Sequence, residues 1–259
     1  MIPVALTVAG SDPSGGAGIQ ADLKTFHQFG VYGQAAITLI TVQNSAGVRR
    51  VECLSADLVA QQFRAAIEDM TPGAVKTGAL GNREIIEAVA DVAAELGCPL
   101  VVDPVAVSKH GARLLAADAV DALKTLLLPG AFLLTPNLEE AEMLTGVPVR
   151  DVAGMYAAAE KLMAMGPRAV LVKGGHLAGD AVDVLFYDGR RLEFTTPRID
   201  TPHTHGTGCT YSAAITALLA KGEELESAVG KAKRYISEAI RTNPGLGRGA
   251  GPVNHHAQP

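Results

Sequence analysis

Residues 205–209 have the sequence His-Gly-Thr-Gly-Cys, and the apolar helical run of residues 212–220 follows almost directly. A glycine loop that opens a helix leaves several backbone N–H groups without partners, and the helix dipole adds a positive field at the same place. The pattern therefore predicts an anion site built from main chain. Four residues would supply its amides: Gly206, Thr207, Gly208 and Cys209.

Cys209 would lie in the first turn of that helix. The positive field there would lower the pKa of its thiol below the free value of about 8.5 and favour the reactive thiolate. The alternative is a small buried apolar residue, which is the commoner fate of an arbitrary cysteine. The neighbouring glycine loop favours the reactive thiol.

Oxygen ligands and one cation follow other apolar runs. Asp103 comes directly after one run, and Asn137 and Glu140 come within a helical turn of another. Carboxylate and amide oxygens close to a phosphate site are what Mg²⁺ prefers, although any one of these residues alone could be a helix cap. Lys173 ends a third apolar run and could contact a phosphate as a point charge.

The first glycine loop, residues 10–18, fits two known phosphate-binding patterns only in part. A Walker A loop requires Lys and Ser or Thr where this chain has Gly16 and Ala17, so that pattern is excluded. The dinucleotide fingerprint is matched by Gly16, Gly18 and Ala21. However, the second predicted strand ends in Gln43 and not in the acid that binds a ribose hydroxyl, so a dehydrogenase is disfavoured.

Short apolar runs alternate with helical patterns along the chain, which predicts a doubly wound, mostly parallel sheet flanked by helices. The expected strands are residues 4–8, 36–42, 74–76, 100–102, 132–134 and 169–172. Expected helices include residues 85–96 and 156–165, and residues 183–187 and 192–195 form an expected antiparallel edge hairpin. Ligands bind such sheets outside the carboxyl ends of the strands, where the polar residues above are placed.

The composition of the chain argues against some classes of function. The chain has 259 residues, a net charge of −5 and 48% hydrophobic residues, so it can fill a large core, and no linker or repeat divides it. We expect a single domain over residues 1–259. The absence of a basic cluster and of tryptophan argues against nucleic acid as a partner.

The longest uncharged stretch, residues 25–48, carries polar residues and glycines, so no membrane span is expected. Three widely spaced cysteines rule out a self-contained disulfide framework and fit the cytoplasm.

Eight motifs together resemble those of the ribokinase-like kinases and, within them, the hydroxymethylpyrimidine and phosphomethylpyrimidine kinases of thiamine biosynthesis. They run nearly from end to end: AGSDPSGGAGIQADLKTF (9–26), VQNSAGV (42–48), KTGAL (76–80), DPV (103–105), LTPNLEEAEML (134–144), VLVKGGH (170–176), THGTGCT (204–210) and GPVNH (251–255). The resemblance implies ATP-dependent phosphorylation of 4-amino-5-hydroxymethyl-2-methylpyrimidine, first to the monophosphate and then to the diphosphate.

On the substrate side, the resemblance implies that Gln43 reads the edge of the aminopyrimidine ring. Three further residues would lie in the substrate pocket: Gly10, Asp22 and, through its backbone, Val105. The chain departs from its relatives at Ala79, where they often carry Met. The smaller side chain loosens the wall against the ring, so a pyridoxine kinase is the alternative enzyme.

On the phosphate side, the resemblance implies that Lys173 and the amides of residues 206–209 hold the transferring phosphoryl group. Cys209 would be the general base, at a place where most ribokinase-like enzymes have Asp. Asp103 and Glu140 would organise Mg²⁺, and Asn137 would lie beside the nucleotide phosphates.

The expected partners are the pyrimidine, ATP and a second copy of the chain in a homodimer, in the cytoplasm. A non-catalytic regulator on the same scaffold is the remaining alternative, disfavoured because it would need neither the thiol nor the acids.

Overall fold

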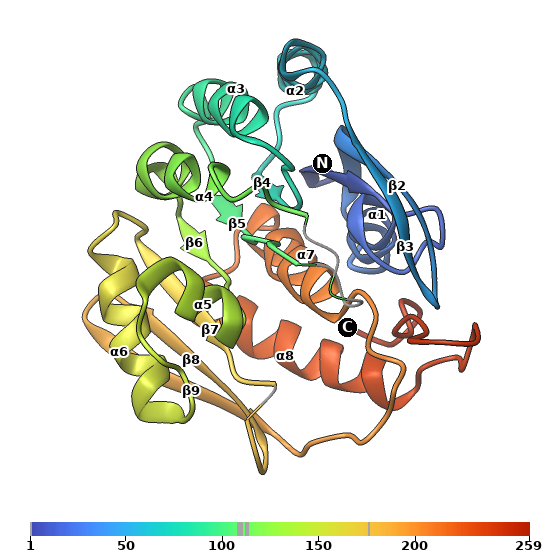
Figure 1. Ribbon diagram of the computed structural model, residues 1–259, viewed down its shortest axis with the longest axis vertical. Coiled ribbons are helices and arrows are strands. Elements are labelled where there is room, and N and C mark those ends of the chain that lie inside the picture. Colours follow the sequence, from blue (N-terminus) through green and yellow to red (C-terminus); the bar gives the residue numbers. More distant parts are fainter. Residues whose placement is uncertain (1, 108–110, 112–113, 176) are drawn as a thin grey trace.

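A computed structural model describes residues 2–107, 111, 114–175 and 177–259, so His176 of the VLVKGGH motif lies outside the described residues. The described chain forms a nine-stranded sheet in the order β3-β2-β1-β4-β5-β6-β7-β8-β9 (Figure 1). The strands are β1 (Val4–Ser11), β2 (Tyr32–Asn44), β3 (Gly47–Cys53), β4 (Ala74–Thr77), β5 (Leu100–Val102), β6 (Leu133–Leu134), β7 (Ala169–Lys173), β8 (Ala181–Tyr187) and β9 (Arg190–Thr196).

Helices cover both faces of the sheet (Figure 1). They are α1 (Gly18–Gln28), α2 (Ala56–Asp69), α3 (Arg83–Ala93), α4 (Ala119–Ala122), α5 (Leu138–Thr145), α6 (Val152–Met163), α7 (Thr207–Ala220) and α8 (Leu225–Arg241). Helices α1, α7 and α8 share one hydrophobic core with the sheet, and α2 to α6 share the other. Within the described ranges, every helix is too short or too polar to cross a lipid bilayer.

The central strands are buried on both faces, which explains their continuous apolar sequence. In β7, for example, Val170 packs in the core of α2 to α6, whereas Leu171 packs in the core of α1, α7 and α8. Strands β2, β1, β4, β5, β6 and β7 pair in parallel, so their carboxyl ends meet at one edge of the sheet. The predicted doubly wound sheet is therefore confirmed.

Both outer edges of the sheet are antiparallel, and the sequence predicted only one of them. The predicted hairpin is β8–β9, and its turn has positive φ at Asp188 (50°) and Gly189 (71°), as a two-residue type I′ turn requires. The other edge strand, β3, pairs with β2 and was not predicted. It carries exposed charges at Arg49, Arg50 and Glu52, which suit an edge strand but interrupt any apolar run.

Helices α1, α2 and α8 were not predicted either, although α8 has a clear helical period. Its buried residues recur every three or four positions: Leu225, Ala228, Val229, Ala232, Tyr235, Ile236 and Ala239. Two of the predicted helices, α3 and α6, begin two and four residues earlier than expected, because Asn82 and Asp151 cap them through their side chains.

Candidate active site

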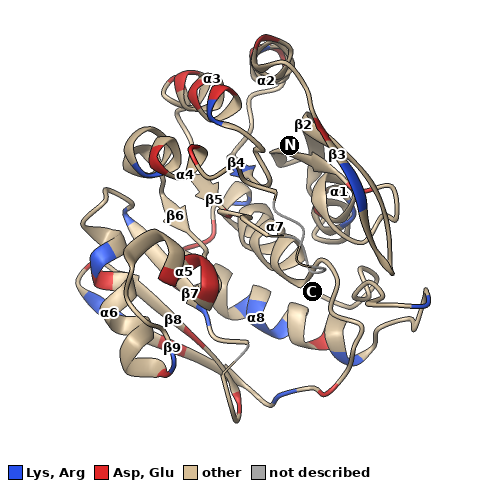
Figure 2. Ribbon diagram, in the orientation of Figure 1, with Lys and Arg blue, Asp and Glu red and all other residues tan. Residues whose placement is uncertain are grey.

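A cavity of about 810 Å³ opens at the carboxyl ends of the parallel strands. The loops after β1, β4, β5 and β7 line it, together with the amino-terminal ends of α5 and α7. In Figure 2 acidic positions are red on the ribbon of α5, the helix whose amino-terminal end lines the cavity. All of the predicted site residues except Asp22 line the cavity: Gly10, Gln43, Asp103, Val105, Asn137, Glu140, Lys173, Gly206, Thr207, Gly208 and Cys209.

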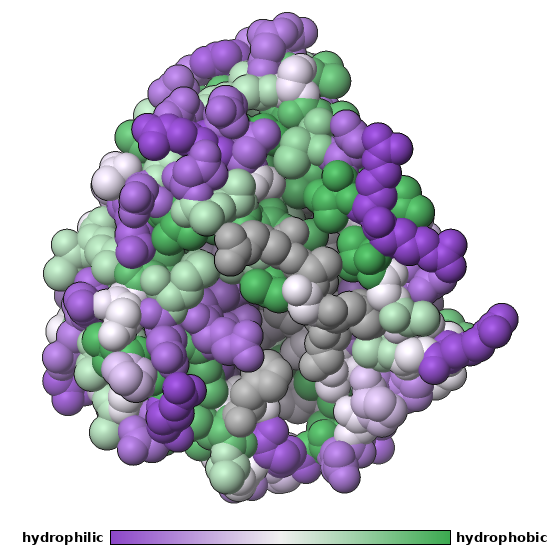
Figure 3. Space-filling view, in the orientation of Figure 1, coloured by the Kyte–Doolittle hydropathy of each residue, from purple (hydrophilic) through white to green (hydrophobic). Residues whose placement is uncertain are grey.

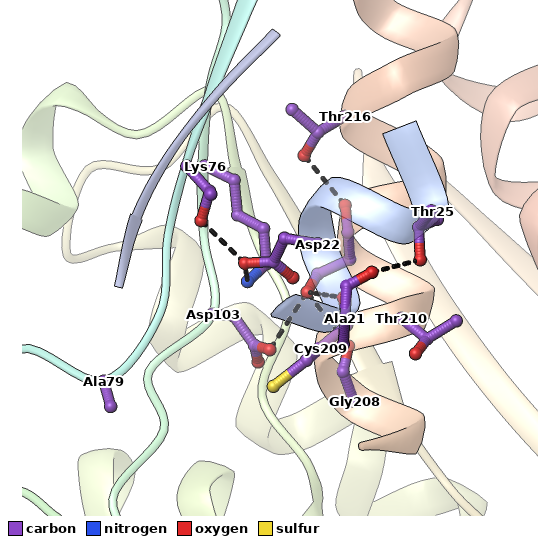
Figure 4. A network of polar contacts seen from close by, with 12 residues as sticks. Ala21, Asp22, Thr25, Lys76, Ala79, Asp103, Gly208, Cys209, Thr210 and Thr216 are labelled. Carbon is purple, nitrogen blue, oxygen red and sulfur yellow. Dashed lines mark hydrogen bonds and ion pairs between the residues drawn. The ribbon is translucent and has the colours of Figure 1, made fainter. Parts of the chain in front are cut away.

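Asp22 lies behind the cavity wall, fully buried under Lys76. Its Oδ2 atom accepts a hydrogen bond from Thr7 Oγ1 at 2.6 Å and pairs with Lys76 Nζ at 2.9 Å. Lys76 does line the cavity, so Asp22 can act on a ligand there through this lysine. Figure 4 shows Asp22, Asp103 and Cys209 gathered near the Lys76 ammonium group.

The anion loop, residues 206–209, leads into α7 as predicted, but of its four expected amides that of Thr207 is already paired. Gly206 caps α7 with a left-handed backbone (φ 78°), and a Cβ atom there would overlap the carbonyl oxygen of Gly16. Thr207 N–H donates to the Thr204 carbonyl at 3.3 Å. No group in the described chain accepts from the N–H groups of Gly206, Gly208 or Cys209, so these three amides are available to an anion.

Lys173 and Asp103 lie directly against this loop. They form an ion pair of 2.9 Å between Nζ and Oδ1, and Ser212 Oγ donates to the other carboxylate oxygen of Asp103 at 3.0 Å. A Cβ atom on Gly208 would lie 3.5 Å from Lys173 Nζ and 3.8 Å from Asp103 Oδ2. A phosphoryl group bound at the amides would therefore be within reach of the ammonium group.

Burial and neighbouring charges shift the pKa values of Asp103 and Lys173 in opposite directions. Burial alone would raise the pKa of Asp103, but the ammonium groups of Lys173 and Lys76 outweigh it and hold that pKa below its ordinary value. Burial alone would lower the pKa of Lys173, but the carboxylates of Asp103 and Glu140 raise it. Lys173 is therefore a permanent cation at neutral pH.

The prediction of a lowered pKa for Cys209 is wrong. Burial raises the pKa of its thiol to about 11, even though Lys76 acts in the opposite direction. The carboxylates of Asp22 and Asp103 raise it further, because they disfavour a second negative charge nearby. Without a bound ligand, Cys209 is thus a neutral thiol at pH 7.

Asn137 and Glu140 form the capping box of α5. The Asn137 side chain accepts from the Glu140 amide at 2.9 Å, and Glu140 Oε2 accepts from the Asn137 amide at 2.8 Å. Glu140 is also buried, and burial together with the charge of Asp103 raises its pKa. The helix-cap alternative considered for these residues therefore holds, while both side chains still line the cavity.

Gln43, Ala79 and Val105, the residues expected on the substrate side, also line the cavity. All three are half-buried, and the Ala79 carbonyl is fixed by a 2.6 Å hydrogen bond from Thr38 Oγ1. A third part of the cavity reaches the buried ion pair of Lys233 with Asp183, 2.7 Å long.

Sequence reasoning missed several buried charged residues of the cavity: Lys76, Asp12, His205, Asp183 and Lys233. Lys76, Asp12 and His205 lie inside motifs whose other residues were assigned roles. A charged residue within an otherwise apolar strand, such as Lys76 in β4, was the available signal.

Comparisons with known proteins agree with one another. The profile of a family described as phosphomethylpyrimidine kinase matches residues 12–254. A hydroxymethylpyrimidine/phosphomethylpyrimidine kinase of Streptomyces coelicolor is 49% identical over 253 residues, covering 98% of this chain and 94% of the relative. Among solved structures, the pyridoxal kinase of Bacillus subtilis in complex with ADP superposes with a TM-score of 0.91 at 40% identity, covering 99% of this chain and 98% of that one. The phosphomethylpyrimidine kinase of Clostridium difficile has a TM-score of 0.82 at 44% identity, covering 93% and 100%.

Proposed function

Because the chain belongs to the phosphomethylpyrimidine kinase family, we infer that it phosphorylates hydroxymethylpyrimidine with ATP to the monophosphate, and the monophosphate to the diphosphate, in thiamine biosynthesis. One observation of the site supports this function. The free amides of Gly206, Gly208 and Cys209 lie beside Lys173 in one cavity, and Gln43 lines the same cavity. Phosphoryl transfer depends mainly on such positioning and on charge.

We assign the following roles. The amides of Gly206, Gly208 and Cys209 hold the transferring phosphoryl group, and Lys173 neutralises its charge. Cys209 takes the proton of the substrate hydroxymethyl group. Substrate contacts come from Gln43 and from the wall at Gly10 and Val105, with Asp22 acting through Lys76.

A mass-spectrometric assay with hydroxymethylpyrimidine, ATP and Mg²⁺ tests the function. We expect products with one and with two added phosphates, and one ADP for each phosphate transferred. ADP release without phosphorylated pyrimidine, or no turnover at all, would contradict the kinase function and favour a ligand-binding regulator.

Gln43→Leu is expected to weaken pyrimidine binding by about 1 to 3 kcal/mol, because the ring would lose amide hydrogen bonds and leave its own polar groups unpaired. Isothermal titration calorimetry with the pyrimidine measures the effect. Gln61, whose amide lies on the exposed face of α2 and pairs only with Asp57, provides the control, since Gln61→Leu should leave the affinity unchanged. Equal affinities for wild type and Gln43→Leu would remove Gln43 from the substrate site.

Asp103 and Glu140 fit a magnesium ion that retains most of its waters. Among the described residues, no cluster of three or more His, Cys, Asp or Glu side chains could hold a metal unaided. Mg²⁺ in nucleotide sites, however, usually takes one or two carboxylates together with substrate phosphates and water. Both carboxylates line the cavity, and the charge of Asp103 makes Glu140 costlier to ionise, which a bound cation would relieve. Bound there with ATP, Mg²⁺ would neutralise charge on the nucleotide phosphates.

Glu140→Gln is expected to raise the Mg²⁺ concentration needed for half-maximal activity by about 10- to 100-fold. Glutamine can keep the capping box with Asn137, so the change removes charge without removing the helix cap. A magnesium titration of activity at saturating ATP, with melting temperatures of both proteins, separates the two effects. A titration curve that coincides with the wild-type curve would leave Glu140 as a helix cap alone.

A pyridoxine kinase remains the second candidate, favoured by the TM-score of 0.91 with a pyridoxal kinase. Ala79 leaves room on the cavity wall for a substituted ring. Competition between pyridoxine and hydroxymethylpyrimidine for limiting enzyme distinguishes them, and the substrate with the larger kcat/KM is the preferred one.

For the whole protein, we propose one kinase domain over residues 1–259 that acts in the cytoplasm as a homodimer. The single sheet of the described residues supports one domain, and three free cysteines suit a reducing compartment. Ile40 and Val42 of β2 are 47% and 50% exposed, and in Figure 3 green surface lies beside the purple band that runs over the β2–β3 hairpin. This surface is our candidate for the dimer contact, and the mass in solution tests it.

A further inference from the structure

The motif GPVNH, residues 251–255, has no part in the roles above, yet it runs beside the anion loop. We call residues 251–255 the C-terminal strap. His205 N–H donates to the Gly251 carbonyl at 3.0 Å, and Val253 N–H donates to the His205 carbonyl at 3.3 Å. His205 directly precedes Gly206. Both its N–H and its C=O are thus hydrogen-bonded to the strap.

The strap itself is anchored in the core. Val253 is buried in the hydrophobic core of α1, α7 and α8, and Asn254 N–H donates to the Ala239 carbonyl of α8 at 2.9 Å. The buried His255 ring lies 3.1 Å from Thr210 Oγ1, in the first turn of α7. The strap therefore joins the anion loop to the two helices beneath it.

The side chain of His205 is fixed from the opposite direction. Its Nε2 atom lies 2.8 Å from Oδ2 of Asp12, and both residues are buried. The Asp12 carboxylate also accepts the amide N–H groups of Ser14 (2.8 Å), Gly16 (3.2 Å) and Ala17 (2.9 Å). Asp12 is therefore the centre of the first glycine loop, and its contact with His205 connects that loop to the anion loop.

The two glycine loops are in close contact at this point. A Cβ atom on Gly16 would lie 2.5 Å from His205 Cδ2 and 3.1 Å from Pro252 Cβ. Since Gly206 in turn packs against the Gly16 carbonyl, a shift of the His205 ring would move Gly206 and the amides that follow it.

We propose that His205, held by Asp12 and by the C-terminal strap, is a positioning residue that sets the geometry of the anion loop for phosphoryl transfer. The inference rests on the proposed function, because it concerns the transition state of that reaction. Amides that stabilise a transition state must be placed within a fraction of an ångström, and a misplacement of about 1 Å can cost about 10²-fold in rate.

The matched variants His205→Gln and His205→Asn test the proposal. The glutamine amide nitrogen can reach the place of Nε2 and donate to Asp12, whereas the shorter asparagine cannot. We expect kcat to fall about 10²-fold in His205→Asn and much less in His205→Gln, with the KM values for ATP and the pyrimidine unchanged. His256→Ala, an exposed position next to the strap, is the control and should keep wild-type kcat.

A binding measurement separates positioning from a general loss of structure. Wild type should bind ADP more tightly when aluminium fluoride and the pyrimidine are added, because the fluoride imitates the transferring phosphoryl group. His205→Asn should lose about 10²-fold of that gain and keep its affinity for ADP alone. If His205→Asn does not fold, Asp12→Asn provides the same readout, because it weakens the same contact from the other residue, and it should lose a comparable part of the gain.

Three outcomes would overturn the proposal: equal kcat for the Gln and Asn variants, an unchanged gain from aluminium fluoride in His205→Asn, or an unchanged gain in Asp12→Asn. Absence of phosphorylated product from the wild-type protein would instead contradict the proposed function.

Discussion

Cys209→Ala is expected to lower kcat for the first phosphorylation by about 10²- to 10⁴-fold while changing substrate affinity little. The thiol opens α7 beside the three free amides, where the substrate hydroxyl must approach the phosphoryl group. Because phosphoryl transfer depends more on positioning than on early proton removal, the low end of that range is the more natural result. Single-turnover measurements of each phosphorylation step determine it.

The two phosphorylation steps provide an internal control. The acceptor of the second step is a phosphate that is already anionic at neutral pH and needs no base. Cys209→Ala should therefore slow the first step and spare the second. Equal slowing of both steps, or none in the first, would leave Cys209 as a packing residue.

The pH dependence follows from the raised pKa of Cys209. With a pKa of about 11, the thiolate fraction in the free enzyme rises about tenfold for each pH unit from 7 to 10. If Cys209 is the base, kcat/KM for hydroxymethylpyrimidine should rise with pH over this range, and the rise should be absent in Cys209→Ala. Cys209→Asp should retain more activity than alanine, and its profile should be flatter because a carboxylate is already ionised at pH 7.

The edge of the sheet that holds the site could be predicted because it depends on local sequence. Each parallel strand is a buried apolar run, and Asp103 and Lys173 are the polar residues that stand at the ends of two such runs. Parallel pairing then brings those ends together whatever the lengths of the connecting helices. The anion loop was predictable for a similar reason, since Gly206 and α7 are adjacent in sequence.

The chemistry of the site was less predictable, because it depends on burial and on distant partners. The helix dipole at Cys209 can be inferred from sequence, but the burial that raises its pKa comes from the whole fold. Asp22 was expected in the pocket, and its partner Lys76 lies 54 residues away along the chain. Asp12 and His205 are separated by 193 residues, so their contact could not be predicted from either of the two motifs that contain them.

Lys173→Met is expected to lower kcat by about 10²- to 10³-fold, the usual effect of removing one group that stabilises transition-state charge. It should also reduce the free energy of unfolding by about 3 to 5 kcal/mol, because Asp103 is left as a buried carboxylate without its partner. Lys161→Met, which removes a lysine that hydrogen-bonds only a backbone carbonyl on α5, is the control for loss of a lysine elsewhere. Urea denaturation and steady-state kinetics measure the two effects.

The double variant Lys173→Met with Asp103→Asn separates stability from catalysis. It removes both charges of the pair, so most of the lost stability should return while kcat stays low.

The pH dependence of stability provides a second check. The folded pKa of Asp103 lies below its unfolded value, so the stabilisation from the pair is present above about pH 4 and is lost as pH falls through the folded pKa. The folded pKa of Lys173 is raised, so its contribution is lost only as pH rises beyond about 10.4. Without Lys173, burial moves the pKa of Asp103 upward, so the two proteins should differ most from about pH 7 to 9 and converge in acid, where Asp103 is protonated in both. A difference that persists unchanged at pH 2 would show that the Lys173–Asp103 ion pair is not its source.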